Sequence, residues 1–124
     1  MIIGVGVDLV DLARFERAAS RTPRLLDRLF AESEQFAGGR QRPLRSLAAR
    51  FAAKEALIKA IGDSAGMRWH DVRVVSNELR NPSFELDGAI ADVVAARGIT
   101  RLHLSMSHDG GVATAYVIAE GAPE

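Results

Sequence analysis

A long helical pattern, from Leu44 to Ile61, constrains the fold of this chain more than any other feature. Pro43 precedes it, and the N–H that proline lacks costs little at the start of a helix. Gly62 follows it as a typical C-terminal stop. On a wheel of about 100° per residue, apolar side chains gather on one face, which predicts a buried stripe. The members of that stripe are Leu47, Phe51, Ile58 and Ile61.

An acid and a base lie at the edge of this face, because Glu55 and Lys59 are spaced i, i+4. Their neighbours on the wheel are Ala48 and Ala52, and such small side chains are expected to leave space beside the charges. A site for a metal ion and a phosphate needs such space. The alternative is a surface ion pair worth ~0.2–0.5 kcal/mol.

Composition bounds the class of protein. The 124 residues are enough for one domain, which we expect to span 1–124. The chain has no cysteine, so disulfides, thiolate metal sites and thiol catalysis are excluded. No apolar run is long enough to span a membrane, and the start lacks the basic region of a signal peptide. We therefore expect a cytoplasmic protein with no membrane partner.

Charge is balanced overall but uneven along the chain. The zero net charge argues against nucleic acid as a partner. Between Arg14 and Arg50, however, nine arginines stand against four acids. Five of these arginines recur at helical spacing, at Arg14, Arg17, Arg21, Arg24 and Arg28. They form either a solvated surface or a docking surface for an acidic partner.

The first strand is predicted over Ile2 to Leu9. Its odd positions are apolar, so the alternation predicts that they face the core. Its even positions from Gly4 onward are Gly4, Gly6 and Asp8. Glycines on one face suggest a close approach, either by another element or by a ligand.

The remaining pattern predicts short helices, a meander and a hairpin. Helices are expected over 12–20, 23–30 and 87–97, with a short turn over 31–36. Strands are expected over 72–79 and 83–86, joined at Asn81-Pro82, and a basic loop runs from Gly38 to Pro43. The strongest hairpin runs over 102–119 and turns at Asp109-Gly110-Gly111.

Polar residues stand at the ends of these apolar elements. Asp8 ends the first strand, Glu55 and Lys59 share a helix edge, and Ser107-His108 ends a hairpin strand. Two carboxylates can hold Mg²⁺, while lysine and histidine can neutralise or donate to a phosphate. This set predicts phosphoryl or phosphodiester chemistry.

Three segments resemble the holo-acyl-carrier-protein synthases, the small 4′-phosphopantetheinyl transferases. The first is Ile3-Gly4-Val5-Gly6-Val7-Asp8-Leu9 with Arg14. The second is Arg50-Phe51-Ala52-Ala53-Lys54-Glu55-Ala56 with Lys59-Ala60. The third is Ser105-Met106-Ser107-His108 with Asp109 and Ala113. The resemblance covers essentially the whole chain. It implies an α+β fold, with an antiparallel sheet packed against a long central helix.

The resemblance also implies a reaction. Phosphopantetheine would pass from coenzyme A, the co-substrate, to a serine of apo-acyl carrier protein, with Mg²⁺ as cofactor. Adenosine 3′,5′-bisphosphate would be released, and the product would support fatty acid biosynthesis and, as a further pathway, polyketide biosynthesis. The family assembles as a trimer with sites between subunits. That assembly suits a first strand whose even face is too bare to close a site alone.

Residue roles carry over by position. The resemblance implies that Asp8 and Glu55 bind Mg²⁺ and that Lys59 lies at the pyrophosphate. The residues that would hold the phosphoadenosine part are Arg50, Pro82 with Asn81, Ser107 and His108. Arg14 would meet the acidic helix of the carrier protein. The general base stays open between Glu55 acting through water, Asp8 and His108, and so does a role for Asp109.

Two other classes of function fit parts of the pattern. A metal-dependent nuclease or phosphohydrolase would use the same acids and lysine. In the usual nuclease pairing, however, the lysine follows an acid by two residues on a strand, whereas Lys59 follows Glu55 by four on a helix. A trimeric binding module without turnover would not need both carboxylates and the lysine.

Overall fold

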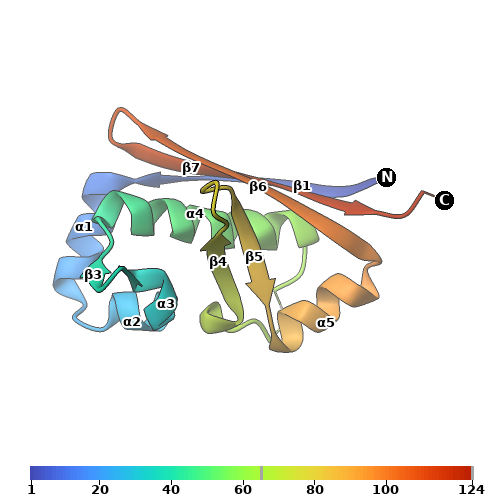
Figure 1. Cartoon of the computed structure of the whole chain (residues 1–124), viewed down its shortest axis with the longest axis horizontal. Helices are drawn as coiled ribbons and strands as arrows, with labels where there is room; N and C mark the ends of the chain where they lie inside the picture. The colour runs from blue at the N-terminus through green and yellow to red at the C-terminus, as the bar shows by residue number, and fades with distance from the viewer. Residues whose placement is uncertain (65, 124) are drawn as a thin grey trace.

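The computed structural model describes residues 1–64 and 66–123. A three-stranded antiparallel sheet covers one side of the central helix α4 (Leu44–Ile61), and the smaller elements cover the other side (Figure 1). This arrangement is the predicted α+β fold. Within the described ranges, no helix is both long enough and apolar enough to cross a membrane.

Helix α4 has the predicted bounds, since it begins after Pro43 and ends at Gly62 in the left-handed conformation (φ 82°). It is buried on several sides instead of along one stripe. Leu47 and Ile61 are fully buried as predicted, whereas Phe51 and Ile58 are only half-buried. Ala48 and Ala52 do not leave open space beside the charges, because both are fully buried in the core.

Strand β1 (Ile2–Asp11) packs with its even face against α4, which reverses the predicted orientation. A Cβ on Gly4 would overlap the carbonyl oxygen of Ala60, and one on Gly6 would overlap that of Ala56. The glycines therefore let two backbones touch. The apolar odd face points away from the core, where Val5 is 56% exposed and Leu9 is 69% exposed.

The main sheet has the order β1-β7-β6, so the last strand β7 (Val112–Gly121) lies between β1 and β6 (Ile99–Asp109). The β6–β7 hairpin turns through Gly110-Gly111, as the sequence predicts. The register of β1 with β7 aligns Asp8 with Ala115 and Val10 with Ala113. Buried alanines line the inner face of β7, and these small side chains bring the sheet close to α4.

Three short helices connect β1 to α4, and they are α1 (Leu12–Arg21), α2 (Leu25–Leu29) and α3 (Glu32–Gln35). Asp11 caps α1 as predicted, because its carboxylate accepts from the backbone N–H of Arg14 at 2.8 Å. The predicted basic loop is partly a small hairpin of β2 (Phe36–Ala37) and β3 (Arg40–Gln41).

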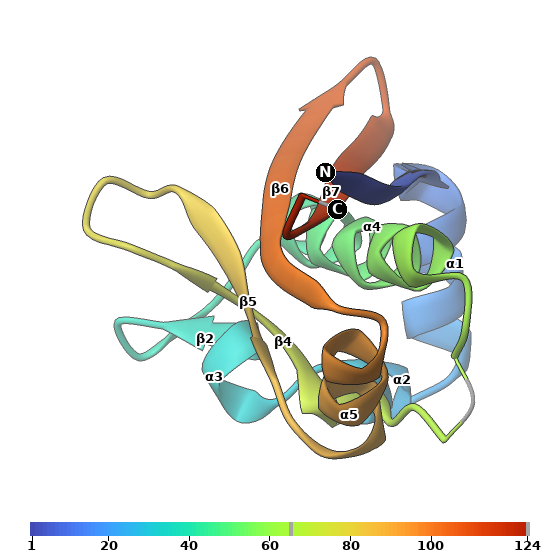
Figure 2. The same cartoon turned by 90° about the vertical axis from the view of Figure 1, so that its right-hand side faces the viewer.

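The second sheet pairs β4 (Val72–Ser76) with β5 (Pro82–Leu86), and it follows the 3₁₀ turn η1 (Trp69–Asp71). Strand β4 is shorter than predicted, because the side chain of Asn77 accepts from the N–H groups of Leu79 and Asn81 and turns the chain there. Helix α5 (Gly88–Ala96) then leads into β6. Figure 2 shows both small hairpins extending to one side of α4.

Candidate active site

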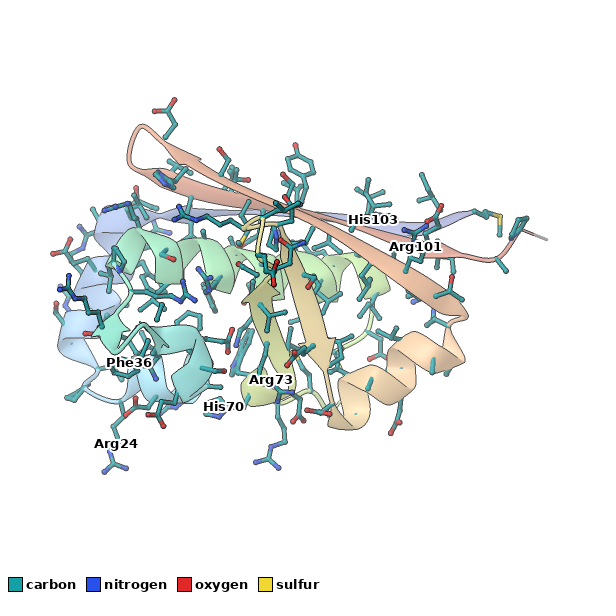
Figure 3. All side chains as sticks on the ribbon, viewed as in Figure 1. Arg24, Phe36, His70, Arg73, Arg101 and His103 are labelled. Carbon is teal, nitrogen blue, oxygen red and sulfur yellow. The ribbon has the colours of Figure 1, made fainter. Side chains whose placement is uncertain are left out.

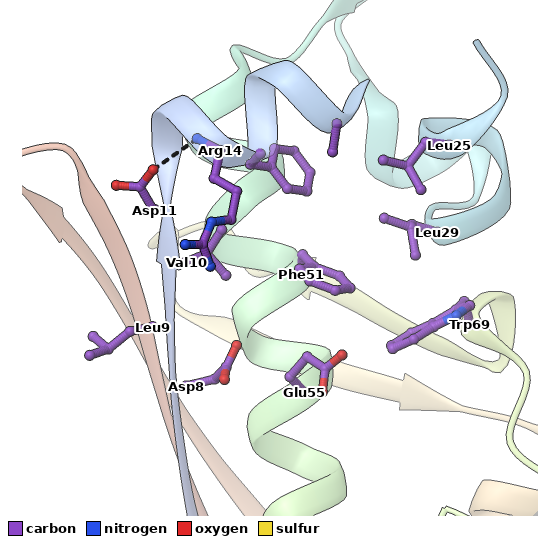
Figure 4. Close-up of a pocket in the computed structure, with 12 residues that line it drawn as sticks. Asp8, Leu9, Val10, Asp11, Arg14, Leu25, Leu29, Phe51, Glu55 and Trp69 are labelled. Carbon is purple, nitrogen blue, oxygen red and sulfur yellow. Dashed lines mark hydrogen bonds between the residues drawn. The ribbon is translucent and has the colours of Figure 1, made fainter. Parts of the chain in front are cut away.

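A pocket of about 440 Å³ lies between β1, α1, α2, α4 and η1. Asp8 and Glu55 reach it from opposite elements, the sheet and the central helix (Figure 4). Arg14 lines the same pocket from the first turn of α1. The structure therefore brings together three predicted site residues that are widely separated in the sequence.

Asp8 is held in place by a lysine and by the glycine contact that precedes it. The Nζ of Lys59 donates to Oδ1 of Asp8 and to the carbonyl oxygen of Val7, both at 3.0 Å. Because Gly6 seats β1 directly on α4, the carboxylate lies within reach of a lysine one turn beyond Glu55. The alternative of a surface ion pair between Glu55 and Lys59 is therefore not what the structure shows, because Lys59 pairs with Asp8 of β1.

Glu55 lies in an environment that disfavours its charge. Partial burial raises the pKa of Glu55 above its ordinary value, and the negative charge of Asp8 raises it further, while Lys59 opposes both effects. Two carboxylates that repel each other in this way are a natural site for a cation. Burial is the largest cause of the raised pKa, and the like charge of Asp8 adds to it.

The donor set fits magnesium. Within the described part of the chain, no group of three or more His, Asp or Glu could hold a metal ion by itself. Mg²⁺ is commonly bound through one or two carboxylates, with waters and substrate phosphates completing its shell. Asp8 and Glu55 would be those ligands, and Lys59 would face a phosphate beside them.

The rest of the pocket is apolar. Aromatic rings form a series from α1 to η1, with 5.9 Å between the ring centroids of Phe15 and Phe51 and 5.6 Å between those of Phe51 and Trp69. Leu25 and Leu29 of α2 complete this wall. The pocket therefore has a charged side and an apolar side, which suits a substrate with a phosphate and an apolar arm.

Comparisons with known proteins agree with this site. Residues 4–118 match the 4′-phosphopantetheinyl transferase superfamily. The chain belongs to this superfamily. It is 60% identical to the holo-acyl-carrier-protein synthase of Clavibacter michiganensis subsp. michiganensis, over 98% of both chains. The transferase is therefore an enzyme, as predicted.

Two solved structures share the fold of the transferase. The crystal structure of the holo-acyl-carrier-protein synthase from Neisseria meningitidis has a TM-score of 0.84 at 33% identity, over 97% of this chain and 99% of that one. The complex of the synthase with coenzyme A from Chronobacterium ammoniagenes has a TM-score of 0.83 at 28% identity, over 97% and 98% of the two chains.

Arg50 lies outside the pocket of the transferase, on another side of α4. Its Nη1 donates to the hydroxyl of Ser46 at 2.6 Å. Burial lowers the pKa of Arg50 to about 10, and the nearby charge of Arg42 adds to the shift. The Nε atoms of both arginines have no hydrogen-bond partner among the described residues. Arg42 and Arg50 together are suited to binding an anion. They do not line the pocket that contains Asp8 and Glu55.

The other predicted contacts of the phosphoadenosine part are also dispersed. His108 pairs with Ala113, which in turn pairs with Val10, so His108 lies two strand spacings (about 10 Å) from β1. Ser107 is its exposed neighbour, and Pro82 begins β5. Within one chain these residues do not converge on Asp8, and their roles stay predictions.

Sequence reasoning missed the apolar wall and the buried pair that supports it. Lys54 is 0% exposed and Glu34 is 1% exposed, and their charges meet at 2.7 Å. One signal was available for the lysine, because Lys54 is seven residues from both Leu47 and Ile61 and so lies in the middle of the apolar face. No comparable signal marked Glu34 or Trp69.

Proposed function

We propose that the transferase moves 4′-phosphopantetheine from coenzyme A to a serine of an apo-acyl carrier protein. The observation that supports this most is the joint placement of Asp8, Glu55 and Arg14 around one pocket, with Lys59 on Asp8. The names of the relatives agree with the substrate, and the coenzyme A complex of one structural neighbour agrees with the donor. Fatty acid biosynthesis is the pathway that such a product would serve.

The reaction forms one bond and breaks one. The serine oxygen attacks the phosphorus that carries pantetheine, and the bond between that phosphorus and the bridging oxygen of the pyrophosphate breaks. Adenosine 3′,5′-bisphosphate leaves, and the serine proton passes to a base, for which Glu55 through water, Asp8 and His108 are the candidates. Asp8 and Glu55 would hold Mg²⁺, which would stabilise negative charge on the 5′-phosphate of the leaving bisphosphate.

The residues of the chain have separate tasks in this scheme. Lys59, which is fixed on β1 by its hydrogen bonds to Val7 and Asp8, neutralises phosphate charge beside the carboxylate of Asp8. Arg14 faces the acidic surface of the carrier protein at the mouth. The apolar wall excludes water from the reacting atoms. Arg50, Pro82, Ser107 and His108 would hold the phosphoadenosine part of a coenzyme A bound between two subunits.

We also propose that the transferase forms a homotrimer through the outer face of its main sheet. The exposed apolar residues of this face are Val5, Val7, Leu9, Tyr116 and Ile118. A contiguous patch of this kind is typical of a protein interface. The predicted boundary at the even face of β1 is corrected, because α4 occupies that face. A neighbouring subunit would supply the dispersed coenzyme A contacts that one chain does not gather.

Mass spectrometry of an apo-acyl carrier protein tests the proposed activity. Incubation with coenzyme A, Mg²⁺ and the transferase should add one phosphopantetheine group to the carrier. Asp8→Asn and Glu55→Gln should each abolish the gain in mass while circular dichroism stays unchanged, because each removes a ligand charge. An unmodified carrier with the wild-type enzyme, or full turnover by either variant, would contradict the proposal.

A further inference from the structure

The buried cation of Lys54 connects α4 to three other segments. Its Nζ donates to the carbonyl oxygen of Leu29 at 2.7 Å, to Oε1 of Glu34 at 2.7 Å and to the carbonyl oxygen of Trp69 at 3.1 Å. An ammonium group has three N–H donors, so all of them are used. The charge also lies 5.0 Å from the centre of the Phe30 ring. Such complete use of a fully buried lysine indicates a defined structural task.

Glu34 is equally well satisfied. Besides Lys54, its Oε1 accepts from the N–H of Ala31 at 3.0 Å, and its Oε2 accepts from the N–H of Val74 at 3.1 Å. The carboxylate therefore joins α3 to β4 and balances the buried lysine. Among the described residues, the hydrogen-bond partners of Glu34 do not line the pocket, so the two members of the pair have different structural roles.

Two of the three acceptors of Lys54 belong to the wall of the pocket. Leu29 ends α2 and Trp69 begins η1, and both line the cavity opposite Asp8. Lys54 directly precedes Glu55 in the sequence, so one helical turn holds the wall from one side and presents the carboxylate on another. A second tie joins the same two elements, since Nε2 of His70 lies 2.6 Å from the carbonyl oxygen of Asp27.

We infer that Lys54 is a positioning residue, which fixes the α2–η1 wall at a set separation from Glu55 and so keeps the reacting groups aligned. The expected effect on activity rests on the proposed function, whereas the expected effect on the position of the wall does not. In an active site a misplacement of about 1 Å can cost about a hundred-fold in rate. Loss of the two wall contacts should therefore lower activity even if the fold is retained.

Two variants that differ only at residue 54 separate positioning from stability. Glu34→Gln leaves Lys54 its contacts with Leu29 and Trp69 but leaves its charge unbalanced. Glu34→Gln with Lys54→Met removes both charges and both wall contacts. Because an unpaired buried charge costs more than a neutral pair, the double variant should melt at the higher temperature. Its activity should nevertheless be the lower of the two, by about ten-fold or more in kcat/KM.

Trp69 provides a readout that needs no substrate, because it is the single tryptophan of the chain. Acrylamide should quench its fluorescence more strongly in the double variant than in Glu34→Gln, which should match the wild type. Equal quenching in the two variants, or activity that follows melting temperature, would overturn the inference. If the double variant fails to fold, Glu34→Gln alone provides the test. Positioning is supported if Glu34→Gln melts at a lower temperature but keeps the quenching and the KM of the wild type. A change in its quenching or its KM refutes positioning.

Failure of the proposed function would give a different result. In that case the wild-type enzyme would not modify the carrier protein at all. The quenching and melting comparisons would still show whether Lys54 holds the wall.

Discussion

At the scale of single residues, the site places two carboxylates from different elements beside one pocket. Asp8 is paired with Lys59, whereas Glu55 lines the pocket with Asp8 and forms no salt bridge among the described residues. Under the proposed function, this pair of carboxylates would hold the metal ion. Arg14 lines the same pocket from α1 (Figure 4), so a positive charge lies beside the two carboxylates.

The first prediction concerns the proton affinity of Glu55 in the metal-free enzyme. Its pKa should lie above 4.5, and Asp8→Asn should lower it, because the variant removes a like charge. The folded state holds this proton more tightly than the unfolded chain. The group therefore contributes less to stability as pH rises from 4.5 through the folded-state pKa. NMR titration of the side-chain carboxyl carbon measures the shift, and an unchanged or higher pKa in Asp8→Asn would contradict it.

The second prediction concerns Arg14. Arg14→Ala should raise the KM for carrier protein far more than the KM for coenzyme A, because the docking charge acts mainly on association with an acidic surface. The effect should weaken as salt rises, since exposed charges are screened over roughly 8–10 Å at moderate salt. Steady-state kinetics at low and high salt measure both constants.

Arg17→Ala is the matched control, because Arg17 is exposed on α1 but does not line the pocket. It should change the KM for carrier protein much less. Arg24, which projects into solvent at the start of α2 (Figure 3), belongs to the same basic series and offers a second comparison. A larger effect of Arg14→Ala on coenzyme A would place Arg14 in the nucleotide site instead.

At the scale of elements, the contact between β1 and α4 determines where the site forms. Gly4 and Gly6 lie directly on the backbone of α4 at Ala60 and Ala56. No side chain separates the strand from the helix at these points. The carboxylate of Asp8 therefore reaches the pocket lined by Glu55 without any long connecting segment.

The third prediction tests this contact. Gly6→Ala should destabilise the fold by roughly 2–3 kcal/mol or more, because the new methyl group would force two backbones apart. Gly38→Ala is a control in open space with φ +60°, and it should cost only about 1 kcal/mol for the left-handed conformation. Urea denaturation at equal protein concentration compares the two. Similar urea midpoints for Gly6→Ala and Gly38→Ala would mean that β1 can move away from α4 without loss of stability.

Most of the helices and strands could be predicted from the sequence, but the orientation of β1 could not. The bounds of α4, the cap at Asp11 and the β6–β7 hairpin follow from local signals, namely proline, glycine and alternation. Alternation also identified which residues of β1 share a face. It could not say which face is inside, because the ordinary rule places apolar residues in the core. In this protein the glycine face of β1 packs against α4, so the apolar face of β1 is exposed.

The site was predictable only in part for a similar reason. Asp8, Glu55 and Lys59 belong to recognisable segments, and the structure brings them together. Glu34 is twenty residues from Lys54 in the sequence, and only the tertiary fold brings the two together. No periodic pattern encodes a pairing of that kind. The same holds for Trp69, whose neighbours in the wall come from α2 and α4.

At the scale of the whole molecule, one face of the main sheet packs on α4, and the described part of the chain leaves apolar residues exposed on the other. The inner face carries the buried alanines of β7, and the outer face carries Tyr116 and Ile118 with the odd residues of β1. Arg101 and His103 of β6 extend this outer surface at one end (Figure 3). The nitrogen Nε2 of His103 lies 3.1 Å from Oε1 of Glu120, so polar groups border the apolar patch.

The fourth prediction concerns assembly through this outer face. Sedimentation at micromolar concentration should give three times the mass of one chain. Ile118→Asp should shift the protein to monomers and reduce turnover, because it places a charge in the apolar patch. Ser33→Asp, at an exposed position of α3, is the control and should remain assembled. A fully active monomer would contradict the shared-site proposal.

The strand order of the main sheet also has a consequence for biosynthesis. β1 precedes the other described elements in the sequence, yet it pairs in the sheet with β7, and Ile2 pairs with Glu120. While the ribosome is still translating the residues between them, β1 has no sheet to join. Contacts between segments so far apart in the sequence form slowly and leave strand edges exposed. The nascent chain therefore carries an unpaired apolar strand through most of its synthesis. Slow translation or premature termination before residue 112 should make this protein a client of chaperones.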